Sequence, residues 1–84
     1  MKIVLNRDYG GFGHHASEEF YLLASEYEND RAHPNLIALV EDYPADCGDL
    51  EIVEIPDNNT DYYIEEYNGA EEIIYVVDGK LYFY

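Results

Sequence analysis

The residues of this chain that could hold a phosphate group lie between Gly11 and Ala16. The segment Gly-Phe-Gly-His-His-Ala fits the G-x-G-x-x-A loop by which dinucleotide-binding folds hold a pyrophosphate at a helix N-terminus. That loop belongs to a strand-helix-strand unit of ~30 residues, whereas the next predicted strand here begins at Leu50. We therefore interpret the segment as a glycine turn that joins a strand to a helix. A small-ligand or nucleotide-binding loop over Gly10–Ala16 is the alternative.

Histidine and Asx residues are the candidate metal ligands. His14 and His15 are adjacent, so their side chains diverge, and no two of the 3 histidines have the i, i+4 spacing that places both on one helix face. Asp57–Asp61 begins like a calcium-binding loop, but Tyr62 stands where that loop requires glycine and Asn68 where it requires glutamate. We therefore predict no metal and no cofactor, and we assign the histidines to the surface or to helix caps.

The sequence contains no set of side chains that is suited to catalysis. Cys47, the single cysteine, lies between Asp46 and Asp49, and negative neighbours disfavour the thiolate that a nucleophile needs. The adjacent acidic pairs at 65–66 and 71–72 lie in predicted strands, where neighbouring side chains point to opposite faces. The sequence therefore predicts a protein that is not an enzyme and that has no catalytic residues.

Helical spacing marks two helices in the N-terminal half. Lys2–Asn6 is a short apolar run that predicts a first strand ahead of the glycine loop. Ser17 is the expected N-cap of a helix whose apolar stripe continues to Tyr27. Pro34 opens a second helix that ends near Tyr43, since proline is favoured at the first helical position.

The C-terminal half predicts strands joined by turns. Asp78-Gly79 suits the type I′ turn of a tight hairpin, and alternation places Tyr63, Glu65 and Tyr67 on one strand face. The run before this turn is apolar on both faces, so we expect it inside the sheet and the last strand at its edge. The strands are predicted at Leu50–Ile55, Asp61–Tyr67, Glu72–Val77 and Lys80–Tyr84. The predicted fold is a single α+β domain over residues 1–84, with two N-terminal helices packed on a mostly antiparallel sheet in the order β-α-α-β-β-β-β.

The net charge of the chain limits the classes of partner that it can bind. The 19 Asp and Glu residues outnumber the 4 Lys and Arg residues and give a formal net charge of −15, which repels DNA, RNA and anionic membranes. The 48% of hydrophobic residues, with 10 tyrosines, supplies the core that a disordered chain lacks. No apolar run approaches the ~18 residues of a membrane span or the core of a signal peptide, so we expect a cytoplasmic protein.

Three stretches carry motifs that are specific in combination and cover most of the chain up to Ala70. They are Met1–Asn6 running into Gly10–Gly13, then Pro34–Ile37, then Ile52–Pro56 leading to Ile64–Gly69. In these motifs the chain resembles a family of small uncharacterised proteins encoded by bacteriophages and prophages. The resemblance implies a phage origin and a bacterial host cell as the place of action, and it carries no known activity.

The acidic charge and the tyrosines together suggest a function. Over the ~30 Å that such a chain spans, duplex DNA carries ~18 phosphate charges, a density of the same order as that of this protein. We therefore predict a phage-derived, non-enzymatic protein that binds a basic, nucleic-acid-binding host protein and blocks it as a DNA mimic. By analogy with phage inhibitors the target is a defence nuclease, which would make the protein anti-CRISPR-like. A soluble acidic protein with no mimicry role is a second alternative to this function.

The predicted partner-binding surface lies on the C-terminal strands. Acidic residues supply its charge, and tyrosines supply contact area at a low entropy cost. Its predicted members are Glu51, Glu54, Asp61, Tyr63, Glu65, Glu66, Tyr67, Glu71 and Glu72.

Overall fold

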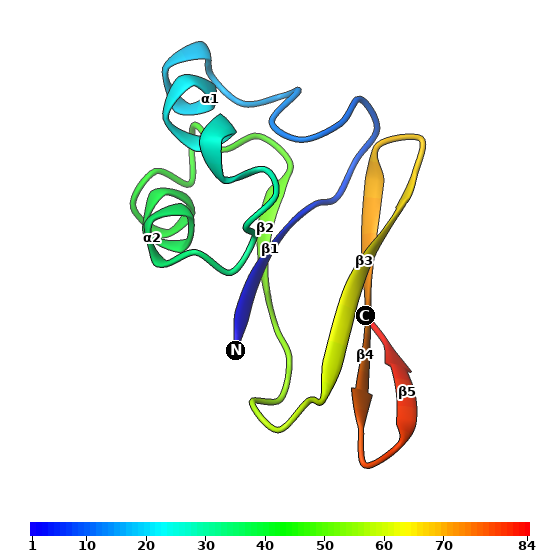
Figure 1. The fold of residues 1–84 in the computed structure, drawn as a ribbon. Helices are drawn as coiled ribbons and strands as arrows, with labels where there is room; N and C mark the ends of the chain where they lie inside the picture. Colours follow the sequence, from blue (N-terminus) through cyan, green and yellow to red (C-terminus); the bar gives the residue numbers. More distant parts are fainter.

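The structure, a computed structural model that describes residues 1–84, consists of three stacked layers. In chain order its elements are β1 (Lys2–Asn6), α1 (Glu18–Ala24), the 3₁₀ helix η1 (Ser25–Tyr27), α2 (Pro34–Asp42), β2 (Leu50–Glu54), β3 (Asp61–Tyr67), β4 (Ala70–Val77) and β5 (Lys80–Phe83). The helices cover one face of the antiparallel sheet β1-β2, and the second antiparallel sheet, β3-β4-β5, lies on the other side (Figure 1). None of the helices has the length and apolar content needed to cross a membrane.

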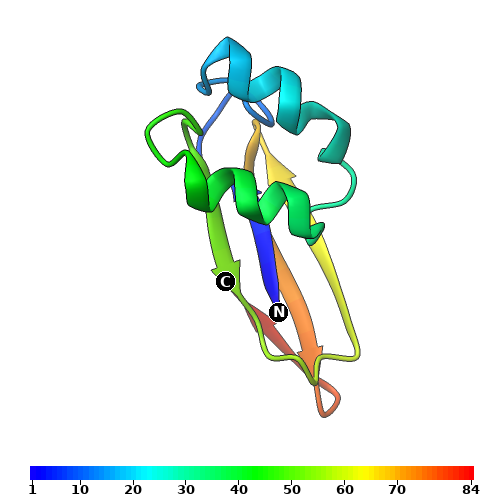
Figure 2. The same cartoon turned by 90° about the vertical axis from the view of Figure 1, so that its left-hand side faces the viewer.

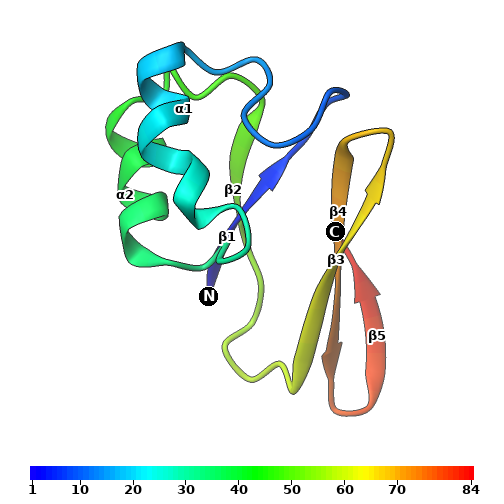
Figure 3. The same ribbon diagram turned by 45° about the horizontal axis from the view of Figure 1, so that its top comes forward.

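The α+β class and the order of the elements are confirmed. The strands form two sheets, and the segment after β2 carries the chain from one sheet to the other (Figure 3). The N-terminus holds this segment in place, because the Met1 ammonium donates to the Ile55 carbonyl at 2.8 Å and to the Asp57 carboxylate at 2.5 Å.

Both helices begin at the residues that the sequence indicates. The Ser17 hydroxyl caps α1 by accepting a hydrogen bond from the Phe20 N–H, as a serine N-cap does. The His33 imidazole caps α2 by accepting from the Asn35 N–H at 3.0 Å, which is one of the two roles predicted for the histidines. Figure 2 shows α1 above α2, with α2 crossing in front of β1 and β2.

Strand β1 has buried side chains on both of its faces because it lies in the middle layer. Val4 faces the helices, whereas Ile3 and Leu5 face the second sheet. The helical core comprises Val4, Phe12, Phe20, Ala24, Leu36, Ile37, Val40, Cys47 and Leu50. The inter-sheet core comprises Ile3, Leu5, Val53, Ile55 and Ile73. The apolar residues of β1 therefore contribute side chains to both hydrophobic cores.

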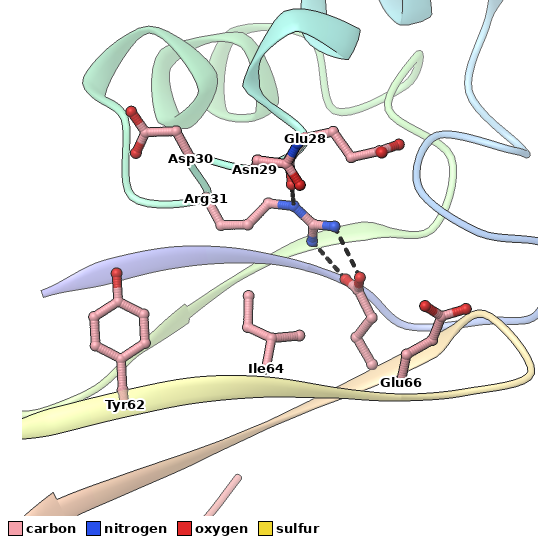
Figure 4. A pocket seen from close by; sticks show the side chains of 8 residues that line it. Glu28, Asn29, Asp30, Arg31, Tyr62, Ile64 and Glu66 are labelled. Atoms are coloured by element: carbon pink, nitrogen blue, oxygen red, sulfur yellow. Dashed lines mark hydrogen bonds and ion pairs between the residues drawn. The ribbon is translucent and has the colours of Figure 1, made fainter.

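A buried ion pair between Arg31 and Glu71 connects the three layers. Arg31, in the loop before α2, donates from Nη1 to Oε1 of Glu71 at 2.5 Å and from Nη2 to Oε2 at 2.8 Å (Figure 4). Nη1 also donates to the Val4 carbonyl on β1 at 3.2 Å. The two side chains are 9% and 8% exposed, so their charges depend on each other and not on water.

Asn6 extends this polar link to the turn between β3 and β4. Its backbone N–H donates to Oε1 of Glu71, and its side-chain amide donates to the Gly69 carbonyl, both at 2.7 Å. The ring of Phe12 lies 4.5 Å from the Arg31 guanidinium, in the arrangement of a cation–π contact. The end of β1, the loop before α2 and the start of β4 are thereby held together.

We predict that Arg31→Met lowers the free energy of unfolding by about 3–5 kcal/mol, because it leaves the Glu71 carboxylate buried and uncompensated. Urea unfolding followed by circular dichroism measures this loss. Replacing both partners, in Arg31→Met with Glu71→Leu, should recover part of the stability because no unpaired charge remains. Lys2→Met, which breaks the exposed pair with Glu41, is the matched control and should leave the midpoint almost unchanged. Equal midpoints for Arg31→Met and Lys2→Met would refute the role of the buried pair.

The C-terminal hairpin has the expected arrangement. Asp78 and Gly79 have φ values of 51° and 74°, as a type I′ turn requires, and β4 lies between β3 and the edge strand β5. The side chains of β5 are exposed, with Leu81 at 60% and Phe83 at 69%. The edge strand contributes backbone pairing and a covering for β4.

We predict that deletion of 79–84 causes aggregation, because β4 would become a bare apolar edge. Ile74 is 3% exposed and pairs with Phe83, so the deletion also uncovers its side chain. Size-exclusion chromatography with light scattering measures the effect. Leu81→Ser in the full chain, which changes an exposed side chain, should remain monomeric. A truncated chain that is monomeric with an unchanged melting temperature would contradict the prediction.

Candidate functional site

One face of the second sheet is open to solvent. Its opposite face carries Tyr62, Ile64 and Tyr75, which pack on the inter-sheet core, so alternation directs the intervening side chains outward. We call this outward surface the acidic-aromatic face. It comprises Asp61, Tyr63, Glu65, Tyr67, Glu72, Leu81 and Phe83.

Large side chains are exposed on the acidic-aromatic face. Tyr63 is 51% exposed, Tyr67 is 78% exposed and Phe83 is 69% exposed. Tyr63, Ile74 and Phe83 are in register across the three strands, with the buried Ile74 at the centre of the row. A contiguous apolar and aromatic row bordered by carboxylates is typical of a protein interface.

Two carboxylates stand directly opposite each other on this face. Glu65 of β3 and Glu72 of β4 are register partners, and both side chains are exposed. Cross-strand partners have Cβ atoms about 5 Å apart, and like charges in this arrangement destabilise a sheet. The structure therefore keeps a locally unfavourable charge pair on an open surface.

The basic side chains lie away from the acidic-aromatic face. Lys2 donates to the Glu41 carboxylate at 2.9 Å, and this hydrogen bond raises the pKa of Lys2 above its ordinary value. The Arg7 guanidinium lies 3.7 Å from the Glu51 carboxylate. Lys80, which pairs with Val77, is on the opposite face of its sheet by alternation. The charge of the acidic-aromatic face is therefore uncompensated.

We predict that Glu65→Gln raises the free energy of unfolding by about 0.2–1 kcal/mol, because it removes the repulsion by Glu72. Urea unfolding at low ionic strength measures the gain, which salt should reduce by screening. Glu18→Gln is the control and should lower the free energy of unfolding, because Glu18 lies in the first turn of α1, where negative charge is favourable. A loss of stability in Glu65→Gln would show that the pair is not repulsive.

The structure brings only part of the predicted surface together. Glu66 points to the opposite side of β3, toward the loop before α2 (Figure 4). Glu51 and Glu54 are exposed but belong to β2 in the other sheet. The predicted residues that share the acidic-aromatic face are Asp61, Tyr63, Glu65, Tyr67 and Glu72.

The placement of Glu71 on a solvated surface is wrong. Its side chain points inward and is 8% exposed, because the Arg31 guanidinium and the Asn6 N–H bind its oxygens. Sequence reasoning could not separate it from Glu72, since the two acids are adjacent and Arg31 is 40 residues away. The prediction that these two neighbours point to opposite faces is correct, because Glu71 is buried and Glu72 is exposed.

Sequence reasoning missed Leu81 and Phe83 as members of the open face. The signal that could have found them is the two-residue turn at Asp78-Gly79, which fixes the hairpin register. That register sets Phe83 opposite Ile74 and Leu81 opposite Val76.

A groove of about 350 Å³ runs between the loop before α2 and the inner side of β3 (Figure 4). The exposed carboxylates of Glu28, Asp30 and Glu66 line it, and the Arg31–Glu71 pair lies in its wall. Since the one cation of the groove is already paired, the groove presents negative charge. It extends the acidic surface around β3 to the other side of the sheet.

The backbone of the loop Gly10–Ala16 makes hydrogen bonds and packing contacts within the protein. Two of its N–H groups already donate to carbonyls of the same loop: His14 to Gly11 at 3.1 Å and Ala16 to Gly13 at 3.1 Å. The loop also packs on the turn between β3 and β4, where a Cβ on Gly69 would lie 2.4 Å from the Gly11 nitrogen. These contacts favour the glycine turn over a phosphate loop.

Cys47 lies in the helical core. Burial raises the pKa of its thiol above the ordinary value of 9.0, and the nearby Asp46 and Asp49 carboxylates add to the effect. The thiol donates toward the Pro44 carbonyl at 3.3 Å. A protonated thiol held among core side chains suits packing better than nucleophilic attack.

No protein-family model, curated protein or solved structure matches this chain. The candidate site therefore rests on the geometry of the chain itself.

Proposed function

We propose that the protein is a non-enzymatic binding protein whose acidic-aromatic face docks on a basic, nucleic-acid-binding protein and blocks the surface that this partner uses for DNA. The Glu65–Glu72 pair carries the proposal. Its mutual repulsion lowers the stability of the free protein, and a cationic partner is the occupant that would turn the pair into a favourable contact. If the charge served solubility alone, the two carboxylates would not need to be register partners on adjacent strands.

The size and charge of the molecule support mimicry of a duplex. Its longest dimension is 41 Å, and its formal net charge is −15. Duplex DNA of that length carries ~24 phosphate charges, at one per ~1.7 Å, so the two charge densities are of the same order. A groove or cleft that accepts DNA by its charge would also attract this protein.

The aromatic residues of the face supply what charge alone does not. Tyr63, Tyr67 and Phe83 are exposed beside the carboxylates. Tyrosine and phenylalanine bury large areas with few rotatable bonds, which favours a long-lived complex once charge has brought the partners together. The face thus combines attraction at long range with contact area at short range.

The resemblance to phage-encoded proteins narrows the proposed class of partner. A phage protein that occupies a DNA-binding surface gains most from a host defence nuclease, so we place its action in the bacterial cytoplasm and its role among anti-CRISPR-like inhibitors. The proposal needs no catalytic residue, because occupation of the surface is enough to inhibit.

Capture from a bacterial lysate on the immobilised protein tests this function. At low salt the captured proteins should be basic and nucleic-acid-binding, and capture should fall steeply in molar salt, where the Debye length shrinks to about 3 Å. Captured proteins that are not basic, or capture that survives molar salt unchanged, would refute electrostatic mimicry.

We predict that Glu65→Lys with Glu72→Lys slows association with the captured partner by at least tenfold, because steering depends on the charge of the docking face. Surface plasmon resonance at low salt measures the rate. Glu18→Lys with Glu19→Lys changes the net charge equally but lies on α1, and it should affect the rate far less. Equal effects of the two double variants would show that the acidic-aromatic face is not the docking surface.

A further inference from the structure

One cluster of ligand-type side chains lies outside the acidic-aromatic face. Asp8 and His15 come from the loop between β1 and α1, and Asp49 comes from the loop before β2. The ligand atoms of these residues all lie within 4.8 Å of one another. The Nδ1 atom of His15 directly contacts a carboxylate oxygen of Asp49. The sequence predicts no metal site because adjacent histidines diverge, but the fold places one histidine beside Asp8 of the same loop and Asp49 from a distant one.

The backbone holds the two loops in fixed positions. The Arg7 N–H donates to the Asp49 carbonyl at 2.9 Å, which extends the β1-β2 pairing beyond its last register pair and sets Asp8 beside Asp49. On the other side, the Ser17 N–H donates to the Asp46 carbonyl at 2.9 Å. The ligand-bearing segments are therefore anchored by the main chain on both sides of the cluster.

Gly48 allows the loop before β2 to approach His15 closely. Its φ is +61°, a conformation that suits glycine, and a Cβ there would lie 2.4 Å from the His15 carbonyl carbon. A larger residue would therefore push Asp49 away from the imidazole. The close approach is a property of this backbone and not of flexible side chains alone.

The charge and accessibility of the cluster suit a cation. The nearest basic residue, Arg7, directs its guanidinium to Glu51 and to the Glu71 carbonyl. The side chains of His15 and Asp49 are 48% and 32% exposed, which leaves a path for an ion and room for bound water. Two carboxylates and one imidazole give a mixed oxygen and nitrogen donor set.

We propose that Asp8, His15 and Asp49 bind a divalent first-row transition ion such as Zn²⁺, with water in the remaining coordination positions. Imidazole nitrogen favours ions of this class over Mg²⁺ or Ca²⁺, and carboxylate oxygen is a common partner ligand. Zinc binds nitrogen and oxygen at about 2.1 Å, so its ligand atoms lie no more than about 4.2 Å apart. Rotation of the exposed Asp8 side chain closes the remaining gap, and the ion takes the place of the direct contact between His15 and Asp49.

Binding of this ion would clamp the loop after β1 to the start of β2. Such a clamp favours the folded chain, because the ligands come together only in the fold. The site lies on a different part of the molecule from the acidic-aromatic face, so its existence does not depend on the proposed function.

Isothermal calorimetry with Zn²⁺ tests the site on the full chain. The wild-type protein should show one saturable site and a higher melting temperature with Zn²⁺ than without it. His15→Ala and Asp49→Asn should each lower the Zn²⁺ affinity at least about tenfold and abolish the thermal shift. Co²⁺ gives an independent readout, since its visible absorption reports a nitrogen and oxygen ligand set that His15→Ala would change.

Matched controls separate this site from general attraction of cations to an acidic protein. His14→Ala removes the neighbouring imidazole, and Asp46→Asn removes an exposed carboxylate from the same loop; both should bind Zn²⁺ like the wild type. Melting curves without metal establish that each variant is folded. The absence of saturable binding, wild-type affinity in His15→Ala, or an equal loss in His14→Ala would overturn the proposal.

Discussion

The buried Arg31–Glu71 ion pair sets the orientation of the side chains along β4. Because Glu71 must point inward to meet the Arg31 guanidinium, alternation sends Glu72 outward, opposite Glu65. A slip of one residue in β4 would bury Glu72 in place of Glu71 and turn Ile73 away from the inter-sheet core. One internal contact thus fixes both the packing of the second sheet and the composition of its open face.

The same pair explains how so acidic a chain forms a layered structure. The chain has only 4 basic residues, so few cations are present to balance its acidic side chains. A buried cation therefore has to bind groups from several elements at once. Arg31 does so by binding the carboxylate of Glu71 and the carbonyls of Val4 and Glu28. The remaining acidic side chains stay at the surface with few cations near them, so much of the negative charge is free to act on a partner.

Local patterns predict the elements of this fold better than they predict its layers. The turn at Asp78-Gly79 and the caps at Ser17 and His33 depend on neighbouring residues, and the structure contains each of them. The division into two sheets depends on β1 being covered on both sides, which only the apolar run at Ile3–Leu5 suggests. The inward Glu71 could not be foreseen, since its partner lies 40 residues away in the sequence.

The central claim is that the acidic-aromatic face and DNA occupy the same surface of the partner. Competition between this protein and a fluorescent duplex for the captured partner tests it most directly, by fluorescence anisotropy at fixed ionic strength. The account predicts that the protein displaces the duplex fully, with an apparent affinity for the partner that weakens in proportion to added duplex. A ternary complex in which partner, duplex and protein are bound together would contradict it.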